Sequence, residues 1–370
     1  MSQMREPRPQ LPILRLRNNH IPYDIILNIL GSVPVKPVIR FRCVSEFLDS
    51  LITTTPYFIS AHLNHNNNNN NNKDSHDNGY VIRMPSVDIY SSSNTNRLNS
   101  IGSCNGLLCF ITYANVIYLW NPSIRKFKML PDTCLGKLQS VILGFAYHSE
   151  NDDYKVVRIS CLSSATHEIE VYTLSLDSWR KLGITFTTNT MFYDYSFLSS
   201  FPLVSGALHW MARSIEEKEQ SFDIIMAFDV NTEKFRKLAL PDGLKDAYYS
   251  KTYLALFEEK LAFITSESGE QPGFRYSIWV MMEYGVVESW NKLFVVPFER
   301  AAYCIAFTEY GSLLTFWCIH SPVEKKKYKF HLINAKTLQQ KKDLDIQYPS
   351  FVATYMESLV LLDGPNTLSY

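Results

Sequence analysis

The sequence predicts a mainly β protein with a small all-α module at its N-terminus. Three observations carry this prediction: apolar residues recur at helical spacing between residues 20 and 63, a stretch without apolar side chains follows, and short runs rich in Val, Ile, Tyr, Phe and Trp fill residues 80–370. Hydrophobic residues make up 46% of the 370 residues, and 22 Phe, 22 Tyr and 6 Trp can build a large core. The 36 basic residues equal the 36 acidic ones, which argues against a polyanion-binding protein held by net charge.

Residues 1–19 are basic and interrupted by prolines, so we predict a disordered tail rather than a signal peptide. No run of 18 apolar residues occurs, so no transmembrane segment is expected. The seven cysteines are scattered without a Cys-x-x-Cys pair, which is typical of reducing, intracellular compartments. We therefore expect a cytoplasmic or nuclear protein, or one found in both places.

Residues 20–63 predict a helical module. Pro22 suits the first turn of a helix, and an apolar stripe repeats after four residues as Ile25, Ile26, Ile29 and Leu30. Three further apolar segments follow, which carry Val38, Ile39, Phe41 and Val44, then Phe47, Leu48, Leu51 and Ile52, then Phe58, Ile59 and Leu63. A module of this size buries little surface, so we expect its apolar faces to need a partner.

Residues 64–79 contain an asparagine run at 66–72 and no apolar side chain at all. Such a stretch cannot bury enough surface to offset the entropy of ordering, which predicts a flexible linker. A prion-like, aggregation-prone role is the alternative, and the shortness of the run favours the linker.

A repeat runs through residues 80–370. Four copies each give an apolar strand, a polar turn and an aromatic residue followed three positions later by Leu, and the aromatic anchors are Phe127, Trp179, Phe235 and Trp290. Their spacings of 52, 56 and 55 residues are close to the period of about 50 expected of kelch-type propeller blades. A fifth copy, FHLINAKTLQQKKDL, has lost the aromatic residue. We predict a β-propeller of five or six blades whose anchors pack between neighbouring blades, with residues 358–362 pairing into the first blade to close the ring.

No constellation of catalytic or metal-binding residues stands out. The segment GSCNG around Cys104 is similar to a nucleophile elbow, but an apolar strand follows where that motif needs a helix, which favours a β-turn with a buried Cys. His209 lies in a strand pattern and is assigned a structural role. The acidic residues 151–153 lack calcium-loop spacing, and the basic residues 325–327 form a short patch, so we interpret both as exposed turns. We predict no catalytic residue, no cofactor and no metal site.

Two sets of segments resemble a known family. The stretch IPYDIILNILGSVPVKPVIRFRCVSEFLDSLI resembles the F-box of plant proteins. Downstream, the segments GSCNGLLCF, LWNPSIRKFKMLP, GFAYHSENDDYKVVRI, GALHW, FDVNTEKFRKL and WVMMEYGVVESWNKLF resemble the F-box-associated interaction domain of the same plant family, which also includes the S-locus F-box proteins. The resemblance implies F-box helices at 20–63, followed by a kelch-like β-propeller at 80–370 that recognises a substrate.

The resemblance also implies a function. The protein would be the non-catalytic substrate-recognition subunit of a Skp–cullin–F-box ubiquitin ligase, with the F-box binding a Skp-type adaptor, and through it cullin, and the β domain binding an unidentified protein target. No nucleic acid or membrane partner is expected. The residues assigned to adaptor binding are Ile21, Pro22, Ile25, Ile29, Pro34, Val35, Val38, Phe41, Val44, Leu48 and Leu51. Some of these side chains must form the module's own core, and the sequence does not apportion them; the alternative is that all of them are internal core.

The chain departs from the family pattern at four positions. Glu46 and Leu48 stand where a Lys and a Trp are usual, and Gly31 and Pro37 replace commoner residues. If the usual Trp contacts the adaptor, its loss lowers the affinity.

Substrate selection is expected in loops between strands, because the repeated strands are committed to packing. The candidate loops are residues 132–140, 183–200, 213–220 and 266–273. Two other functions remain open: a kelch-like interaction scaffold without ligase coupling, and a propeller enzyme with catalytic groups in its central funnel.

Overall fold

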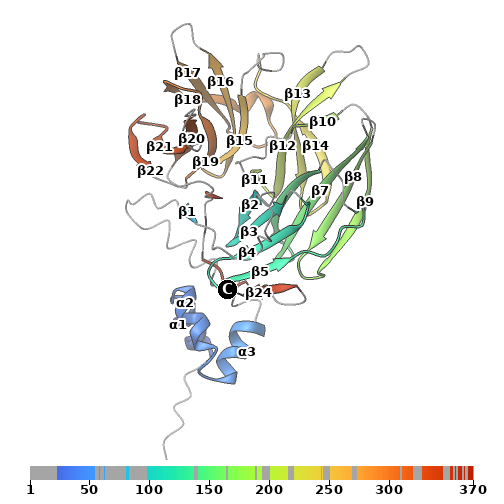
Figure 1. The fold of residues 1–370 in the computed structure, drawn as a ribbon, viewed down its shortest axis with the longest axis vertical. Coiled ribbons are helices and arrows are strands. Elements are labelled where there is room, and N and C mark those ends of the chain that lie inside the picture. The colour runs from blue at the N-terminus through green and yellow to red at the C-terminus, as the bar shows by residue number, and fades with distance from the viewer. Residues whose placement is uncertain are drawn as a thin grey trace, which may run out of the picture.

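The computed structural model describes residues 23–54, 58, 62, 81–82, 98–112, 114–136, 141–163, 166–187, 190–193, 201–215, 221–242, 244, 251–268, 273–308, 311–319, 327–344, 351–352, 355, 357–360, 362 and 366–369. In this part of the chain three helices precede a β-propeller of five blades, which confirms the predicted fold class and decides between five and six blades. The helices gather beneath the first blade, beside the C-terminal end of the chain (Figure 1). The predicted tail at 1–19 and linker at 64–79 lie outside the described residues.

The helices are α1 (Tyr23–Gly31), α2 (Val35–Phe41) and α3 (Glu46–Thr54). Pro37 lies in the first turn of α2, where its missing N–H would have no partner within the helix. The Leu48 N–H donates to the Ser45 hydroxyl oxygen at 3.2 Å, which caps the start of α3. Phe58 and His62, the described residues of the fourth predicted segment, are also helical.

Each blade is an antiparallel sheet whose strands follow one another outward from the centre. The first blade has β2 (Leu98–Cys104), β3 (Leu107–Thr112), β4 (Ile117–Asn121) and β5 (Lys126–Met129), and the second has β6 (Val141–His148), β7 (Asp153–Ser163), β8 (Thr166–Thr173) and β9 (Ser178–Thr187). The third has β10 (Thr190–Phe192), β11 (Leu203–Val204), β12 (Ala207–Ile215), β13 (Ser221–Asp229) and β14 (Lys234–Leu238). The fourth has β15 (Lys251–Phe257), β16 (Lys260–Ser268), β17 (Phe274–Met281), the 3₁₀ turn η1 (Val287–Ser289) and β18 (Trp290–Phe298), and the fifth has β19 (Tyr303–Phe307), β20 (Ser312–Ile319), β21 (Lys327–Asn334) and β22 (Gln340–Leu344).

The two ends of the propeller meet through short strands. β24 (Thr367–Ser369) pairs antiparallel with β5 and covers the outer edge of the first blade. β1 (Val81–Ile82) pairs with β23 (Phe351–Val352) and so joins the segment before the first blade to the segment after the fifth. The prediction that residues 358–362 form the closing strand is wrong. The carbonyls of Ser358 and Val360 accept hydrogen bonds from the Asn121 side chain rather than from a strand edge, and the described strand that pairs with the first blade is β24, at residues 367–369.

Three of the four aromatic anchors pack between blades as the repeat predicts. Trp179, Phe235 and Trp290 begin the outermost strands of the second, third and fourth blades, and each lies in the apolar core shared with the preceding blade. The Trp179 Nε1–H donates to the Pro131 carbonyl at 2.9 Å. The Trp290 Nε1–H donates to the carbonyl of Ala239 at 3.1 Å, just past the outer strand of the blade before it. Phe127, the anchor of the first blade, is buried and stacks on Trp120.

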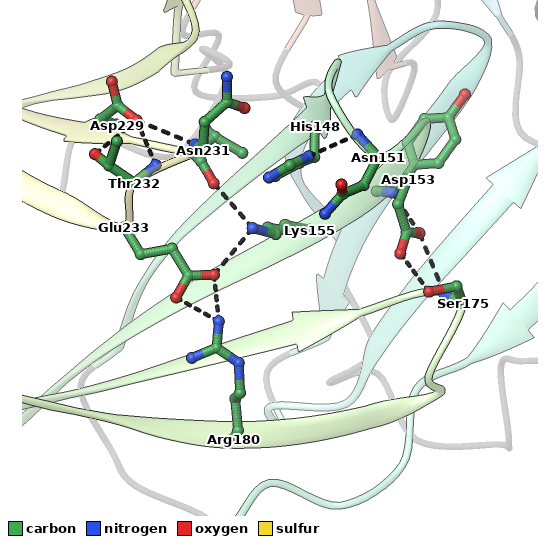
Figure 2. Close-up of polar contacts among 12 residues, drawn as sticks. His148, Asn151, Asp153, Lys155, Ser175, Arg180, Asp229, Asn231, Thr232 and Glu233 are labelled. Atoms are coloured by element: carbon green, nitrogen blue, oxygen red, sulfur yellow. Dashed lines mark hydrogen bonds and ion pairs between the residues drawn. The ribbon is translucent and has the colours of Figure 1, made fainter.

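The residue after the anchor carries a second repeated contact between blades. Lys128 Nζ lies 2.9 Å from Asp177 Oδ2 in the turn of the second blade. Figure 2 shows the corresponding contact one blade further, where Arg180 and Lys155 converge on the carboxylate of Glu233. Lys128 and Arg180, the basic residues that follow the anchors of the first and second blades, therefore form ion pairs with the next blade.

Candidate functional site

The helices expose an apolar face. In the described part of the chain 13 large hydrophobic side chains are exposed, and five of them lie between residues 25 and 47. Exposed apolar side chains are therefore concentrated in the helical module. They are Ile25 and Ile29 on α1, Phe41 at the end of α2, Val44 in the following turn, and Phe47 on α3. Val44 is 68% exposed, and Ile29 and Phe47 are each 52% exposed. Exposed groups of this kind mark surfaces that bind another protein.

The opposite side of the same helices forms a small core. It contains Leu30, Val35, Val38, Leu51, Ile52 and Phe58, together with Leu359 from the C-terminal segment, and Ile124 of the first blade packs against it. His62 is buried beside this core, and its Nε2 lies 2.8 Å from the Val33 carbonyl. The helices thus bury one side against the propeller and leave the other open.

The structure sorts the residues assigned to adaptor binding into three groups. Ile25, Ile29, Pro34, Phe41 and Val44 are exposed. Leu48 is half-buried and packs on the core. Val35, Val38 and Leu51 are buried in that core, so the structure corrects their assignment to an open surface: they face one another and Leu359. The side chains of Ile21 and Pro22 lie outside the described residues, and contact with an adaptor stays a prediction for the whole set.

Phe47 belongs to the exposed face, but the sequence did not single it out. It shares a helical stripe with Leu51, four residues later, and Leu51 is buried. Spacing alone therefore could not separate the open residue from the buried one. The available signal was an aromatic side chain in the first turn of a helix that begins after the capping residue Ser45.

Leu48 and Glu46 mark the departure from the family pattern. Leu48 packs against the core of the helices, so its side chain contributes little to the open face. Glu46 is exposed in the first turn of α3, where a carboxylate is favourable beside the positive end of the helix dipole.

The residues weighed for catalysis take structural positions. Burial raises the pKa of Cys104 to about 12, which keeps the thiol protonated and poorly nucleophilic. Burial lowers the pKa of His209 to about 4; its Nδ1–H donates to the Pro202 carbonyl at 3.2 Å, and its Nε2 accepts from the Tyr284 hydroxyl at 2.8 Å. Both imidazole nitrogens are thus occupied by neighbours within the fold.

The acidic turn before β7 is held internally as well. Asp153 accepts from the Ser175 N–H at 3.2 Å, and the Ser175 hydroxyl also donates to this carboxylate, as Figure 2 shows. Among the described residues no group of three or more His, Cys, Asp or Glu could hold a metal ion. No helix in the described part of the chain is long and apolar enough to cross a membrane.

The strands that lead into the predicted substrate loops end on one face of the propeller. In an antiparallel blade the turns after the first and third strands lie on one face, and the turns after the second and fourth lie on the other. Ile124, which touches the helical module, lies in the turn after the third strand of the first blade. The segments 132–140, 183–200, 213–220 and 266–273 follow or begin within second or fourth strands, and those strands end on the opposite face. Residues 183–187, 213–215 and 266–268 belong to the strands themselves, and residues 137–140, 188–189, 194–200, 216–220 and 269–272 lie outside the described residues.

One of these loops is anchored by a buried ion pair. Arg158 Nη1 lies 2.6 Å from Glu170 Oε2 and donates to the Thr133 hydroxyl at 3.0 Å. The Leu135 N–H donates to Glu170 Oε1 at 2.8 Å, and Arg158 Nη2 donates to the Gly136 carbonyl at 2.9 Å. The described start of the 132–140 loop is therefore fixed on the second blade.

Comparison with known proteins gives two family matches. Residues 19–59 match the F-box domain, and residues 57–362 match the F-box associated beta propeller domain. Similar curated proteins include the F-box/kelch-repeat protein At3g23880 of Arabidopsis thaliana, which is 26% identical over 305 residues, covering 75% of this chain and 80% of that protein. The F-box protein CPR1 of Arabidopsis thaliana is 24% identical over 378 residues, covering 92% of this chain and 87% of that protein.

Proposed function

Because the chain belongs to the F-box-associated β-propeller family, we propose that it is the substrate-recognition subunit of a Skp–cullin–F-box ubiquitin ligase. In this role the helices bind a Skp-type adaptor, and through it cullin, while the propeller binds a protein target. The F-box match supports the adaptor contact, and the propeller supplies a second, separate binding surface.

The observation that carries the proposal is the open apolar face of the helices. A soluble chain with this much exposed apolar surface on one small module gains free energy by covering it with a partner. Ile29, Val44 and Phe47 are exposed, so a partner that binds this face can bury them. Apolar and aromatic anchors of this kind carry most of the energy in protein interfaces.

The geometry suits catalysis by proximity. The strands that lead into the predicted target loops end on the propeller face opposite to the turn that touches the helices, so a target bound there would not block the adaptor. Holding the target and the ubiquitin-charged enzyme in one complex raises their effective concentration. The chain itself then contributes binding and orientation, and the chemistry belongs to its partners.

The test is a double substitution on the open face. We expect Ile29→Asp with Val44→Asp to weaken binding to a Skp-type adaptor by at least about 100-fold, because two carboxylates would be desolvated in an apolar contact. Calorimetric titration with the full-length chain measures the change. Leu176→Asp is the matched control, since Leu176 is equally open at 68% exposed but lies on the second blade.

Two results would contradict the proposal. One is an unmodified chain that shows no association with the adaptor at micromolar concentration. That result would instead support the scaffold function, to which the replacement of the usual Trp by Leu48 points. The other is a double variant that binds as tightly as the unmodified chain.

A further inference from the structure

The core of the F-box helices is completed from the far end of the chain. Leu359 is fully buried among Leu30, Val35, Val38, Leu51, Ile52 and Phe58, and Ile124 packs against the same cluster. A helical module this small cannot close its own core, so these two side chains supply apolar contacts that the helices lack. Leu359 is thus part of the F-box fold, although it lies beyond the last blade.

Side chains of the first blade hold the segment that carries Leu359. Asn121, which is fully buried, donates from Nδ2 to the carbonyls of Ser358 at 3.1 Å and Val360 at 2.8 Å. The Ser358 N–H donates to the Ser123 hydroxyl at 3.1 Å, and the Tyr355 hydroxyl hydrogen-bonds the same group. These bonds fix the backbone on both sides of Leu359.

The same segment also enters the propeller core. Leu362 is fully buried in the core between the first and second blades, and Val360 packs against that core. Leu359 and Leu362 therefore anchor one short segment in two different cores. Since the open face of the helices lies on the side away from this joint, the segment sets the direction in which that face points.

We propose that Leu359 and Ile124, held by Asn121, are positioning residues for the adaptor surface: they lock the F-box helices onto the propeller and keep α2 and α3 folded in the free protein. The adaptor part of this inference rests on the proposed function. The folding part concerns the free chain and stands without it.

Hydrogen exchange of the full-length chain without any partner tests the folding part. We expect Leu359→Ala to speed amide exchange in α2 and α3 by roughly 30-fold or more, because a cavity opens in a core that few residues build. Ile124→Ala should act in the same direction. Asn121→Asp should do so too, since it keeps the acceptor for the Ser123 N–H but loses both donors to the segment.

Two matched controls separate this effect from general destabilisation. Leu362→Ala removes the same side chain from the same segment, and we expect it to speed exchange in β3 and β6 rather than in the helices. Leu176→Ala changes the turn position of the second blade that corresponds to Ile124, and we expect no change there because Leu176 is exposed. Unchanged exchange in α2 and α3 of Leu359→Ala would overturn the proposal.

Adaptor titration then tests the positioning part. We expect Leu359→Ala to weaken adaptor binding and Leu359→Met, which restores most of the volume, to recover it. Ile29→Asp with Val44→Asp should lose binding while its helices exchange at the normal rate. Faster helix exchange in Leu359→Ala with full adaptor affinity would contradict the positioning role, whereas an unmodified chain that never binds the adaptor contradicts only the proposed function.

Discussion

Arg158 and Glu170 show how a single buried pair can fix a loop. Their side chains are 2% and 0% exposed, so both lose their hydration on folding. Hydrogen bonds from Leu135 and to Thr133 and Gly136 satisfy the remaining donors and acceptors, which makes the burial tolerable. The exit of the first blade is thereby pinned to the second, at the base of a predicted substrate loop.

Breaking this pair should be costly. We expect Arg158→Met to lower the free energy of unfolding by about 3–5 kcal/mol, because Glu170 remains buried without its partner. Equilibrium unfolding in urea measures the loss, provided that the free energy of unfolding depends on urea concentration with the same slope in both proteins. Lys181→Met is the control: Lys181 and Glu168 form an exposed pair at 3.4 Å, worth roughly 1 kcal/mol or less. Equal losses in the two variants would show that the buried pair has no special weight.

Turns between the third and fourth strands act as couplers between blades. Asp177 and Glu233 occupy matching turn positions with positive φ of 47° and 55°, and each receives a basic residue from the preceding blade. Gly285 takes this position in the fourth blade, where Arg236 lies 4.4 Å from the ring centroid of the neighbouring Tyr284. Repetition of one turn geometry thus repeats one inter-blade contact.

The coupling at Glu233 predicts a pH dependence. Burial acts to raise the pKa of Glu233, but hydrogen bonds and charge from Arg180 and Lys155 outweigh it, so the pKa lies below its ordinary value of 4.5. A lowered carboxyl pKa stabilises the fold above 4.5, and this contribution is lost as the pH falls through the folded-state pKa. We expect Glu233→Gln to lower the melting midpoint at pH 7, with a difference from the unmodified chain that shrinks below pH 4.5.

Scanning calorimetry across this pH range measures the effect. Glu168→Gln provides the comparison, because the Glu168 carboxylate pairs with the exposed Lys181. A Glu233→Gln deficit that persists unchanged below pH 4 would exclude the charge as its source.

Apolar clusters and short strands hold the ring of blades together. Four apolar clusters join consecutive blades from the first to the fifth. The β1–β23 pair and β24 on β5 bring the two ends of the chain together. The strands that join the two ends thus lie in the same C-terminal region that holds the F-box helices (Figure 1).

Two truncations should separate closure from F-box support. Removal of residues 363–370 uncovers the edge of β5, and we expect a melting midpoint lower by about 2–4 °C and more self-association, with adaptor affinity retained. Removal of residues 357–370 also takes Leu359, and we expect the adaptor affinity to fall as well. Calorimetry, light scattering and adaptor titration measure the three effects. Equal adaptor affinity in the two truncations would contradict this division.

Local patterns in the chain were enough to predict the helical module, the mainly β body and the repeat. Helical spacing from Ile25 to Leu30 and the recurring aromatic anchors depend on neighbours within a few residues or on copies of the same unit, so both are visible in one sequence. The exposed residues Ile25, Ile29 and Val44 were among those assigned to adaptor binding, but the sequence did not separate them from residues of the module's own core.

Which apolar residue faces inward depends instead on contacts between distant segments. Val35 and Val38 lie in a core that Leu359, from the other end of the chain, helps to cover. The spacing of apolar residues along α2 does not indicate this contact. The closing strand at residues 367–369 and the count of five blades likewise depend on which edges meet in space. The periodicity of apolar residues in the sequence indicates that one face of a helix is apolar. Only packing between distant segments determines which residues cover that face.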